Sequence, residues 1–175
     1  MDKEIIKDYL SRRGYKFKSI YKVNIKTFDD ISYKFSNDNS EIDIYWIDKF
    51  GKVNLKYLIE SNFFINDCII IYRDKITSEC KNNIKFYLKQ NKKLRIEIFF
   101  IEELQFNIFD HVLSSQHISK LSIQEKLDLL KIYNIKHLTR QLLSDPISKA
   151  LACEPNDIVK YIDNNEITYR LCFDC

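Results

Sequence analysis

The sequence predicts an α/β domain over residues 1–107 and a small α+β module over residues 108–175. Two observations support this division. A strand, a helix and a second strand follow one another across residues 67–101, which is the order of a βαβ unit with parallel strands. Beyond residues 107–111 the pattern changes to short capped helices and a hairpin. With 45% hydrophobic residues, a chain of 175 residues can bury one core or two small ones.

The first half begins with a helix over residues 2–12, which Gly14 should end. Its apolar face is made of Ile5, Ile6, Tyr9 and Leu10. Residues 15–40 are polar and short-patterned, and they predict irregular structure or weak strands. The later elements are a strand over 41–47, a helix over 53–61, a strand over 67–72, a helix from Thr77 or Ser78 to about Gln90, and a strand over 94–101.

The second half holds stronger local signals. Ser122 and Glu125 form a capping box, and the following helix carries an apolar stripe, which in a surface helix normally faces the core. The stripe consists of Ile123, Leu127 and Leu130. Asp145 followed by Pro146 predicts a short helix that reaches about Ala152. Strands over 157–162 and 166–173, joined by Asp163-Asn164-Asn165, complete a hairpin.

The overall composition excludes few classes of function. The net charge of +3 does not by itself imply a nucleic-acid partner. Five cysteines, odd in number and scattered, suit a reducing compartment. The first eight residues do not resemble a signal peptide, and the apolar runs have strand length, so we expect no membrane contact. The two glycines cannot form a phosphate loop and no serine sits in a nucleophile elbow, so we expect no cofactor.

A metal-dependent nuclease would need an acid and an acid-x-Lys on neighbouring strands. Asp43 could supply the first carboxylate, and Glu79-Cys80-Lys81 is the acid-x-Lys of this chain. That tripeptide falls at a predicted helix start, where an acid is favourable for structural reasons, and we prefer this interpretation.

Two further groups allow metal chemistry. Cys172 and Cys175 form a C-x-x-C, which His137 and Cys153 could complete as a zinc site. His111 and His117 could be metal ligands or an acid/base pair. For both groups we favour a structural role, as a small apolar side chain for Cys172 and as hydrogen-bonded side chains for the histidines.

A basic helix face is the main functional feature of the first half. Lys81, Lys85 and Lys89 recur at four-residue spacing, and Thr77 and Ser78 precede them at the helix N-terminus. Backbone N–H groups at such an end favour a phosphate. The face is either an ordinary solvated surface or a sequence-independent contact with a nucleic-acid backbone.

The polar residues of the last third follow a known pattern. It comprises His111, Leu113 and His117, then Leu138-Thr139-Arg140, Asp145-Pro146-Ile147-Ser148-Lys149, Ile158-Val159-Lys160-Tyr161 and Tyr169-Arg170-Leu171-Cys172. This pattern resembles the fifth shared subunit of eukaryotic RNA polymerases, whose C-terminal module corresponds to a separate subunit of the archaeal RNA polymerase. Ser114-Ser115 replace the family's Val-Pro, and two family glycines fall on Ala152 and Asn156. In the first half, Arg13-Gly14-Tyr15 is similar to a family motif.

The resemblance implies a non-catalytic subunit with two parts. The N-terminal part would be a jaw domain of restriction-endonuclease-like topology without the active site, lining the path of downstream duplex DNA. The C-terminal part would be an assembly module that docks on the largest polymerase subunit, with one copy in each complex. The host would be a nuclear polymerase or that of a large DNA virus, which places the chain in the nucleus, or in a virion or host cytoplasm.

The resemblance also assigns residues to these roles. For partner binding we expect His111, His117, Arg140, Asp145, Pro146, Lys160, Tyr169 and Arg170. Nearest DNA we expect Thr77, Ser78, Lys81 and Lys85. The competing hypotheses are a metal-dependent nuclease that uses Asp43 and Glu79, and a stand-alone DNA-binding regulator whose affinity would fall steeply with salt.

Overall fold

The computed structural model describes residues 2–22, 31–47, 66–74, 77–90, 95–111 and 114–174. The chain forms two compact units, Met1–Gln105 and Phe106–Cys175, which we call the N-terminal and C-terminal units. The division falls two residues before the expected boundary between residues 107 and 108. Among the described residues, no helix is long and apolar enough to cross a membrane.

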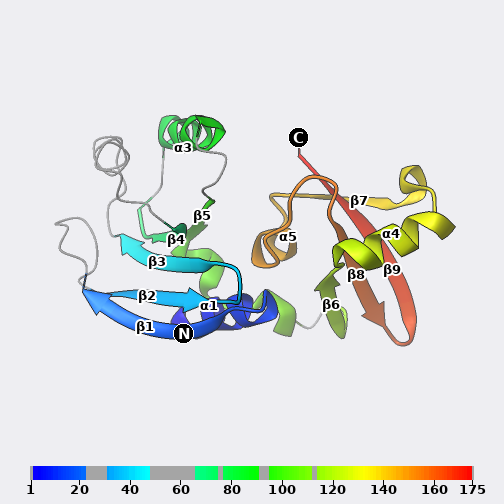
Figure 1. Ribbon diagram of the computed structural model, residues 1–175, viewed down its shortest axis with the longest axis horizontal. Coiled ribbons are helices and arrows are strands. Elements are labelled where there is room, and N and C mark those ends of the chain that lie inside the picture. Colours follow the sequence, from blue (N-terminus) through cyan, green and yellow to red (C-terminus); the bar gives the residue numbers. More distant parts are fainter. Residues whose placement is uncertain are drawn as a thin grey trace. The chain divides into compact units, whose positions relative to one another are not determined.

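A mixed five-stranded sheet forms the centre of the N-terminal unit, in the order β1-β2-β3-β4-β5 (Figure 1). Strand β2 pairs antiparallel with both β1 and β3, whereas β4 pairs parallel with both β3 and β5. The strands are β1 (Lys16–Lys22), β2 (Ile31–Ser36), β3 (Glu41–Ile47), β4 (Asp67–Tyr72) and β5 (Ile96–Phe100). The predicted βαβ unit is therefore confirmed, and the segment predicted as irregular or weakly extended contains the two complete strands β1 and β2.

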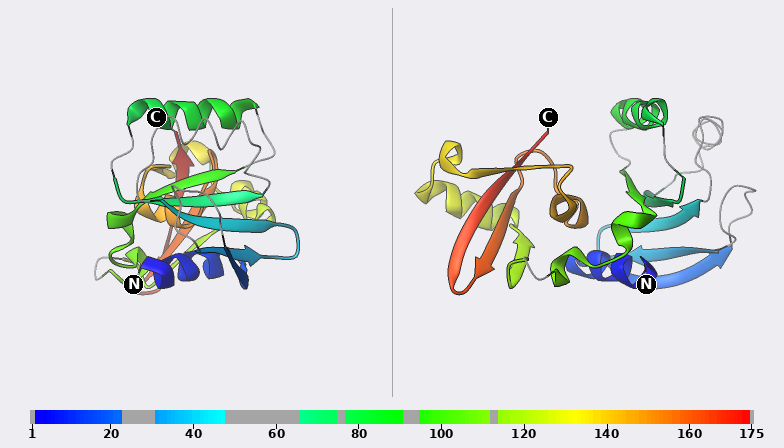
Figure 2. Two further views of the ribbon diagram at one scale, coloured as in Figure 1. Left: turned by 90° about the vertical axis from the view of Figure 1, so that its left-hand side faces the viewer. Right: turned by 180° about the vertical axis from the view of Figure 1, so that it is seen from behind.

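Helices lie on both sides of this sheet, α1 (Asp2–Arg12) on one and α3 (Ser78–Gln90) on the other (Figure 2). The four apolar residues predicted for the inner face of α1 are all buried, and the ring of Tyr9 lies 6.3 Å from that of Phe99. A 3-10 turn, η1 (Ile101–Leu104), follows β5. The helix predicted over residues 53–61 lies outside the described residues.

A buried ion pair ties the end of α1 to β5. The Arg13 guanidinium donates to both carboxylate oxygens of Glu97 at 2.9 Å, and the two side chains are 6% and 13% exposed. Gly14 follows with a φ of 82°, a left-handed conformation that ends the helix as predicted. The chain thus turns sharply into β1 at one edge of the sheet, while Arg13 stays fixed to β5 at the other edge.

The C-terminal unit holds a four-stranded sheet in the order β6-β8-β9-β7. Its strands are β6 (His117–Lys120), β7 (Thr139–Leu142), β8 (Ile158–Asp163) and β9 (Glu166–Phe173). Its helices are α4 (Ile123–Ile132) and α5 (Pro146–Ala150), with the 3-10 turns η2 (Ile108–Asp110) and η3 (Ile135–His137). The predicted hairpin is confirmed as β8 and β9, and Asn164 and Asn165 both have positive φ at its turn.

Local capping fixes the helices of this unit as predicted. Ser122 and Glu125 form a capping box at α4, and Asp145 accepts the backbone N–H of Ile147 at the start of α5. The far end of α5 is closed by two backbone bonds, from Ala152 to Lys149 and from Cys153 to Ser148. This is a Schellman motif, and it places Ala152 at a φ of 54°, a position where glycine is usual.

Candidate docking surface

The strand register separates the C-terminal sheet into two faces. One face carries Ile118, Val159, Tyr161 and Cys172, which form a buried cluster with Leu151 just beyond α5, and we call it the α5 face. The opposite face carries Arg140, Lys160 and Tyr169, and we call it the α4 face. Contacts from α4 identify the second face, because the Tyr133 ring at the end of α4 lies 6.3 Å from that of Tyr169. The two faces therefore offer different surfaces.

A polar network lies inside the α5 face. Buried Gln141 donates to Ser148 at 2.8 Å and to Asp145 at 3.3 Å, and it accepts the hydroxyl of Tyr161. Burial raises the pKa of Tyr161 to about 12, so its hydroxyl stays a donor at neutral pH. The Arg170 guanidinium lies 4.3 Å from the centre of the Tyr161 ring. The network joins α5 to three strands and holds Asp145 at the start of the helix.

The residues predicted for docking do not form one strip. Arg140, Lys160 and Tyr169 lie on the α4 face, whereas Arg170 lies on the α5 face. Asp145 and Pro146 begin α5, where Asp145 acts as the helix cap. Lys160 is half-buried and lies close enough to Glu125 of α4 to lower the pKa of that carboxyl, after the larger effect of its hydrogen bonds with Ser122.

The two predicted histidines occupy the beginning of the C-terminal unit. His111 ends η2, and its ring lies 5.9 Å from that of Phe106. His117 starts β6, where it is exposed and pairs with Ile162. In the described part of the chain, no three His, Cys, Asp or Glu side chains converge in a way that could hold a metal ion.

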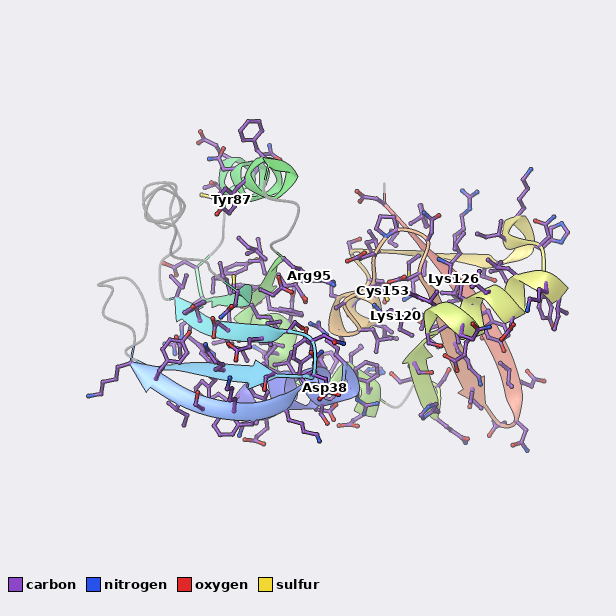
Figure 3. All side chains as sticks on the ribbon, in the orientation of Figure 1. Asp38, Tyr87, Arg95, Lys120, Lys126 and Cys153 are labelled. Atoms are coloured by element: carbon purple, nitrogen blue, oxygen red, sulfur yellow. The ribbon has the colours of Figure 1, made fainter. Side chains whose placement is uncertain are left out.

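The cysteines considered for zinc lie in the core of this unit. Cys172 is buried on the α5 face, 3.8 Å from the Ser148 hydroxyl. A hydrogen bond between the thiols raises the pKa of Cys153 and lowers that of Cys172. Cys153 follows α5 beside Lys120, which donates to the carbonyl of Ala152 at 3.3 Å (Figure 3). These contacts give both cysteines a place in the packing, and Cys175 lies outside the described residues.

The predicted DNA-proximal residues lie in the first half of α3 or directly before it. Thr77 and Ser78 are exposed, and the Thr77 hydroxyl accepts the backbone N–H of Cys80 at 3.3 Å. Lys81 and Lys85 belong to the same helix, but their side chains lie outside the described part of the structure. The threonine hydroxyl thus already satisfies one N–H group of the helix end.

The nuclease hypothesis gains no geometric support. Asp43 lies buried in the middle of β3, where one carboxylate oxygen accepts a hydrogen bond from Asn66 at 3.1 Å. Glu79 and Lys81 lie on α3, so the acid-x-Lys stands on a helix as expected rather than on a neighbouring strand. The tripeptide therefore does not place a carboxylate and a lysine on a strand that neighbours Asp43, as this chemistry requires.

Much of the apolar stripe of α4 is exposed to solvent. Ile123 is 82% exposed and Leu127 is 53% exposed, while Leu129 is the buried residue of the helix. Ile132 and Tyr133 at the helix end are also exposed, and no role was assigned to them from the sequence. Their solvent exposure could have been suspected from one signal, since the helix has apolar residues on more sides than a single stripe requires.

The C-terminal unit is thus a small sheet whose polar groups take part in its packing and whose surface carries exposed apolar side chains, as protein–protein contact surfaces do. Residues 106–172 match the model of the family described as RNA polymerase Rpb5, C-terminal domain. The match covers nearly the whole C-terminal unit.

Three relatives extend this finding. The chain is 45% identical over 58 residues to the DNA-directed RNA polymerase subunit Rpo5 of Thermococcus kodakarensis, covering 32% of this chain and 70% of the relative. It is 35% identical over 114 residues to the subunit rpabc1 of RNA polymerases I, II and III of Dictyostelium discoideum, covering 61% and 57%. It is 27% identical over 130 residues to subunit 5B of RNA polymerases IV and V of Arabidopsis thaliana, covering 68% and 57%.

The chain belongs to the family of the fifth RNA polymerase subunit, which includes these archaeal Rpo5 and eukaryotic proteins. It spans little more than half the length of the eukaryotic relatives. The archaeal relative, in contrast, is covered over 70% of its length by 58 residues of this chain.

Proposed function

We propose that the chain is a non-catalytic structural subunit of a multi-subunit DNA-directed RNA polymerase. The observation that carries this proposal is the match to the archaeal protein. Because 58 residues of this chain cover 70% of that protein, a unit of this kind is most of a polymerase subunit by itself. The polar groups of the C-terminal unit serve its packing, which supports a role in assembly rather than in chemistry.

The proposed partner of the C-terminal unit is the largest polymerase subunit. Its docking residues would come from the predicted set, above all Arg140 and Tyr169 on the α4 face and Arg170 on the α5 face. Arginine offers a planar pair of donors for a partner's carboxylates or carbonyls. Asp145 would contribute indirectly, by fixing the start of α5.

Tagged full-length chain, purified from its native source, tests both statements. We expect the other polymerase subunits to co-purify, and lysine-reactive cross-linking to join Lys126, Lys131 or Lys136 to the largest subunit. Absence of polymerase subunits would contradict the proposed function. Cross-links to the largest subunit from the N-terminal unit alone would contradict the division of roles.

We assign the N-terminal unit the role of a jaw domain beside downstream duplex DNA, with a restriction-endonuclease-like topology. A mixed five-stranded sheet with helices on both sides supports that topology, and the exposed Thr77 and Ser78 support the contact. The polymerase fixes the location of the chain: the nucleus for a nuclear enzyme, or the virion and host cytoplasm for a viral one.

A photo-reactive amino acid at Ser78 tests the jaw role in the assembled polymerase. On a transcribing complex we expect cross-links from this position to the duplex ahead of the enzyme. The same group at Asn164, on the hairpin turn of the C-terminal unit, serves as the control position. Equal labelling from both positions, or none from Ser78, would remove the DNA-lining role.

A further inference from the structure

A long stretch of the C-terminal unit is free of acidic residues. Residues 129–144 contain no Asp or Glu, but they contain Lys131, Lys136, His137 and Arg140. This stretch runs from the end of α4 through η3 into β7. The unit as a whole is nearly neutral, with eight Lys and Arg against nine Asp and Glu over residues 106–175. The positive charge is therefore local, and it gathers where α4 ends.

Aromatic side chains lie on the α4 face, and one of these cations, Arg140, lies beside them. The Tyr133 ring is 6.3 Å from that of Tyr169, and the Arg140 guanidinium lies 5.8 Å from the centre of the Phe173 ring. Arg140 pairs with Leu171 in the register, so it shares the face of Tyr169 and Phe173. We call Tyr133, Lys136, Arg140, Tyr169 and Phe173 the basic–aromatic surface.

Two features leave this surface open to a partner. Among the described side chains, neither Lys136 nor Arg140 forms an ion pair, whereas the neighbouring Lys131 pairs with Asp128 at 2.7 Å. A shallow hollow of about 450 Å³ is lined by residues 130–135, which directly precede Lys136 in the chain and include Tyr133. Ile132 and Tyr133 at the hollow are 79% and 51% exposed. Apolar area and cations without a carboxylate partner thus occur together.

We infer that the basic–aromatic surface binds an acidic peptide segment of the largest polymerase subunit, one that carries an apolar side chain to fill the hollow. The inference rests on the proposed function for the identity of the partner. Charge complementarity determines the chemistry of the segment, because Arg140 can bind a carboxylate through two parallel N–H donors and Lys136 adds a second cation. Burial of Tyr133 and Ile132 around the anchoring side chain supplies the apolar contribution.

A nucleic-acid backbone fits this surface less well. Such binding requires several cations that follow successive phosphates, and it is strongest for proteins with a marked positive charge. Here two cations stand among exposed apolar side chains, in a unit with one more acidic than basic residue. A peptide that combines carboxylates with an apolar side chain satisfies both parts of the surface.

Competitive incorporation tests the charge requirement. Full-length wild type and a Lys136→Glu/Arg140→Glu variant, carrying different tags, are expressed together, and their ratio is measured in the purified polymerase and in the lysate. We expect the variant to be depleted about tenfold or more, since reversing charges in a complementary interface both removes attraction and adds repulsion. Thermal melts of both isolated chains verify that the variant is folded.

A control with the same charge change is Lys16→Glu/Lys22→Glu, at two exposed lysines of β1 in the N-terminal unit. It should enter the polymerase in a ratio near one. If wild type itself fails to enter the polymerase, the proposed function is wrong. If wild type enters and the Lys136→Glu/Arg140→Glu variant enters equally well, the inference is wrong while the proposed function stands.

Photo-cross-linking identifies the occupant. Benzoylphenylalanine replaces Tyr133 in the full chain, the polymerase is assembled and irradiated, and the joined peptide is sequenced by mass spectrometry. We expect a segment of the largest subunit with several Asp or Glu residues and an apolar residue at the point of attachment. Attachment to nucleic acid, to a different subunit, or to a segment without acidic residues would overturn the inference, as would the absence of any attachment.

Discussion

The N-terminal unit buries the middle of its sheet on both faces, whereas the C-terminal unit leaves much of its apolar surface in solvent. In β3 and β4 nearly every residue is buried, including the polar Asp43. Among the described residues, the exposed large apolar side chains of the N-terminal unit are Phe17, Ile20 and Phe86. Those of the C-terminal unit are Phe106, Ile123, Leu127, Ile132, Tyr133, Leu142 and Ile167.

The contrast separates a unit that completes its own core from one that keeps apolar area available. Arg13 and Glu97 close the N-terminal unit with a desolvated ion pair, which brings specificity to the packing of α1. The C-terminal unit is held by the Gln141 network and by helix caps, while its α4 carries exposed apolar residues. Exposed apolar area of this kind is typical of protein–protein contact surfaces.

Removal of the buried ion pair should have the largest effect, and it should be confined to the N-terminal unit. Arg13→Ala leaves Glu97 with one remaining arginine, Arg95 at 3.1 Å, and should lower the free energy of unfolding by about 3 kcal/mol. The single tryptophan, Trp46, is buried in β3, so its fluorescence in urea reports this unit alone. Arg12→Ala, which breaks the more exposed pair with Asp8, is the matched control and should cost less than about 1 kcal/mol. If both variants lose the same free energy of unfolding, the buried ion pair does not stabilise the unit more than the exposed one.

Breaking the polar network should be the next largest effect, and it should spare the N-terminal unit. Gln141→Ala removes the amide that pairs with the hydroxyls of Tyr161 and Ser148, at a cost of about 2–3 kcal/mol. Amide hydrogen exchange in β8 and β9 should accelerate, while the Trp46 transition stays unchanged. Gln124→Ala, at an exposed site on α4, is the control. A shift of the Trp46 transition would show that the two units do not unfold independently.

A stabilising change is expected at the end of α5. Ala152 has a φ of 54°, and a left-handed backbone costs a residue with a Cβ about 1–2 kcal/mol. Ala152→Gly should therefore raise the stability of the C-terminal unit by about 0.5–1 kcal/mol, measured by the same exchange experiment. Ala150→Gly, inside the same helix, should have the opposite sign. Destabilisation by Ala152→Gly would mean that packing of the Ala152 methyl group outweighs the backbone strain.

The smallest effect should be a pH dependence at the start of α4. Hydrogen bonds from the Ser122 hydroxyl and backbone hold the pKa of Glu125 below its ordinary value of 4.5. A lowered folded-state pKa means that this stabilisation is complete above pH 4.5 and disappears as the pH falls through the folded-state value. The protection factor of amides in the first turn of α4, which is the intrinsic exchange rate divided by the observed rate, should therefore fall at acidic pH. Glu125→Gln should abolish that pH dependence, and persistence of the dependence in this variant would assign it to another group.

The parts of the fold that could be predicted from the sequence are those whose conformation depends on residues close to one another in the chain. The capping box at Ser122, the start of α5 at Asp145 and the turn at Asn164 all depend on neighbouring residues, and all are confirmed. Strands β1, β6 and β7 were missed or underestimated because their burial is slight, so little apolar alternation marks them. Their pairing is decided by distant strands, which periodicity does not register.

The candidate site was predictable as a set of residues, but not as a surface. Arg140 and Arg170 were both selected from the sequence, yet the register places them on opposite faces of the sheet. The exposure of Ile123 could not be read from its spacing, because a stripe indicates an apolar face without indicating what covers it. Three-dimensional information was needed to find Tyr133 beside Tyr169.

The two edges of the C-terminal sheet are strands of four residues each, β6 and β7. A short edge offers few unpaired backbone groups on which another copy of the chain could build a continuous sheet. The exposed apolar side chains of this unit therefore stand beside sheet edges that are poorly suited to extension by another strand. The short length of these two strands thus leaves contacts between side chains, rather than pairing of backbone groups, as the main means by which this sheet can bind another molecule.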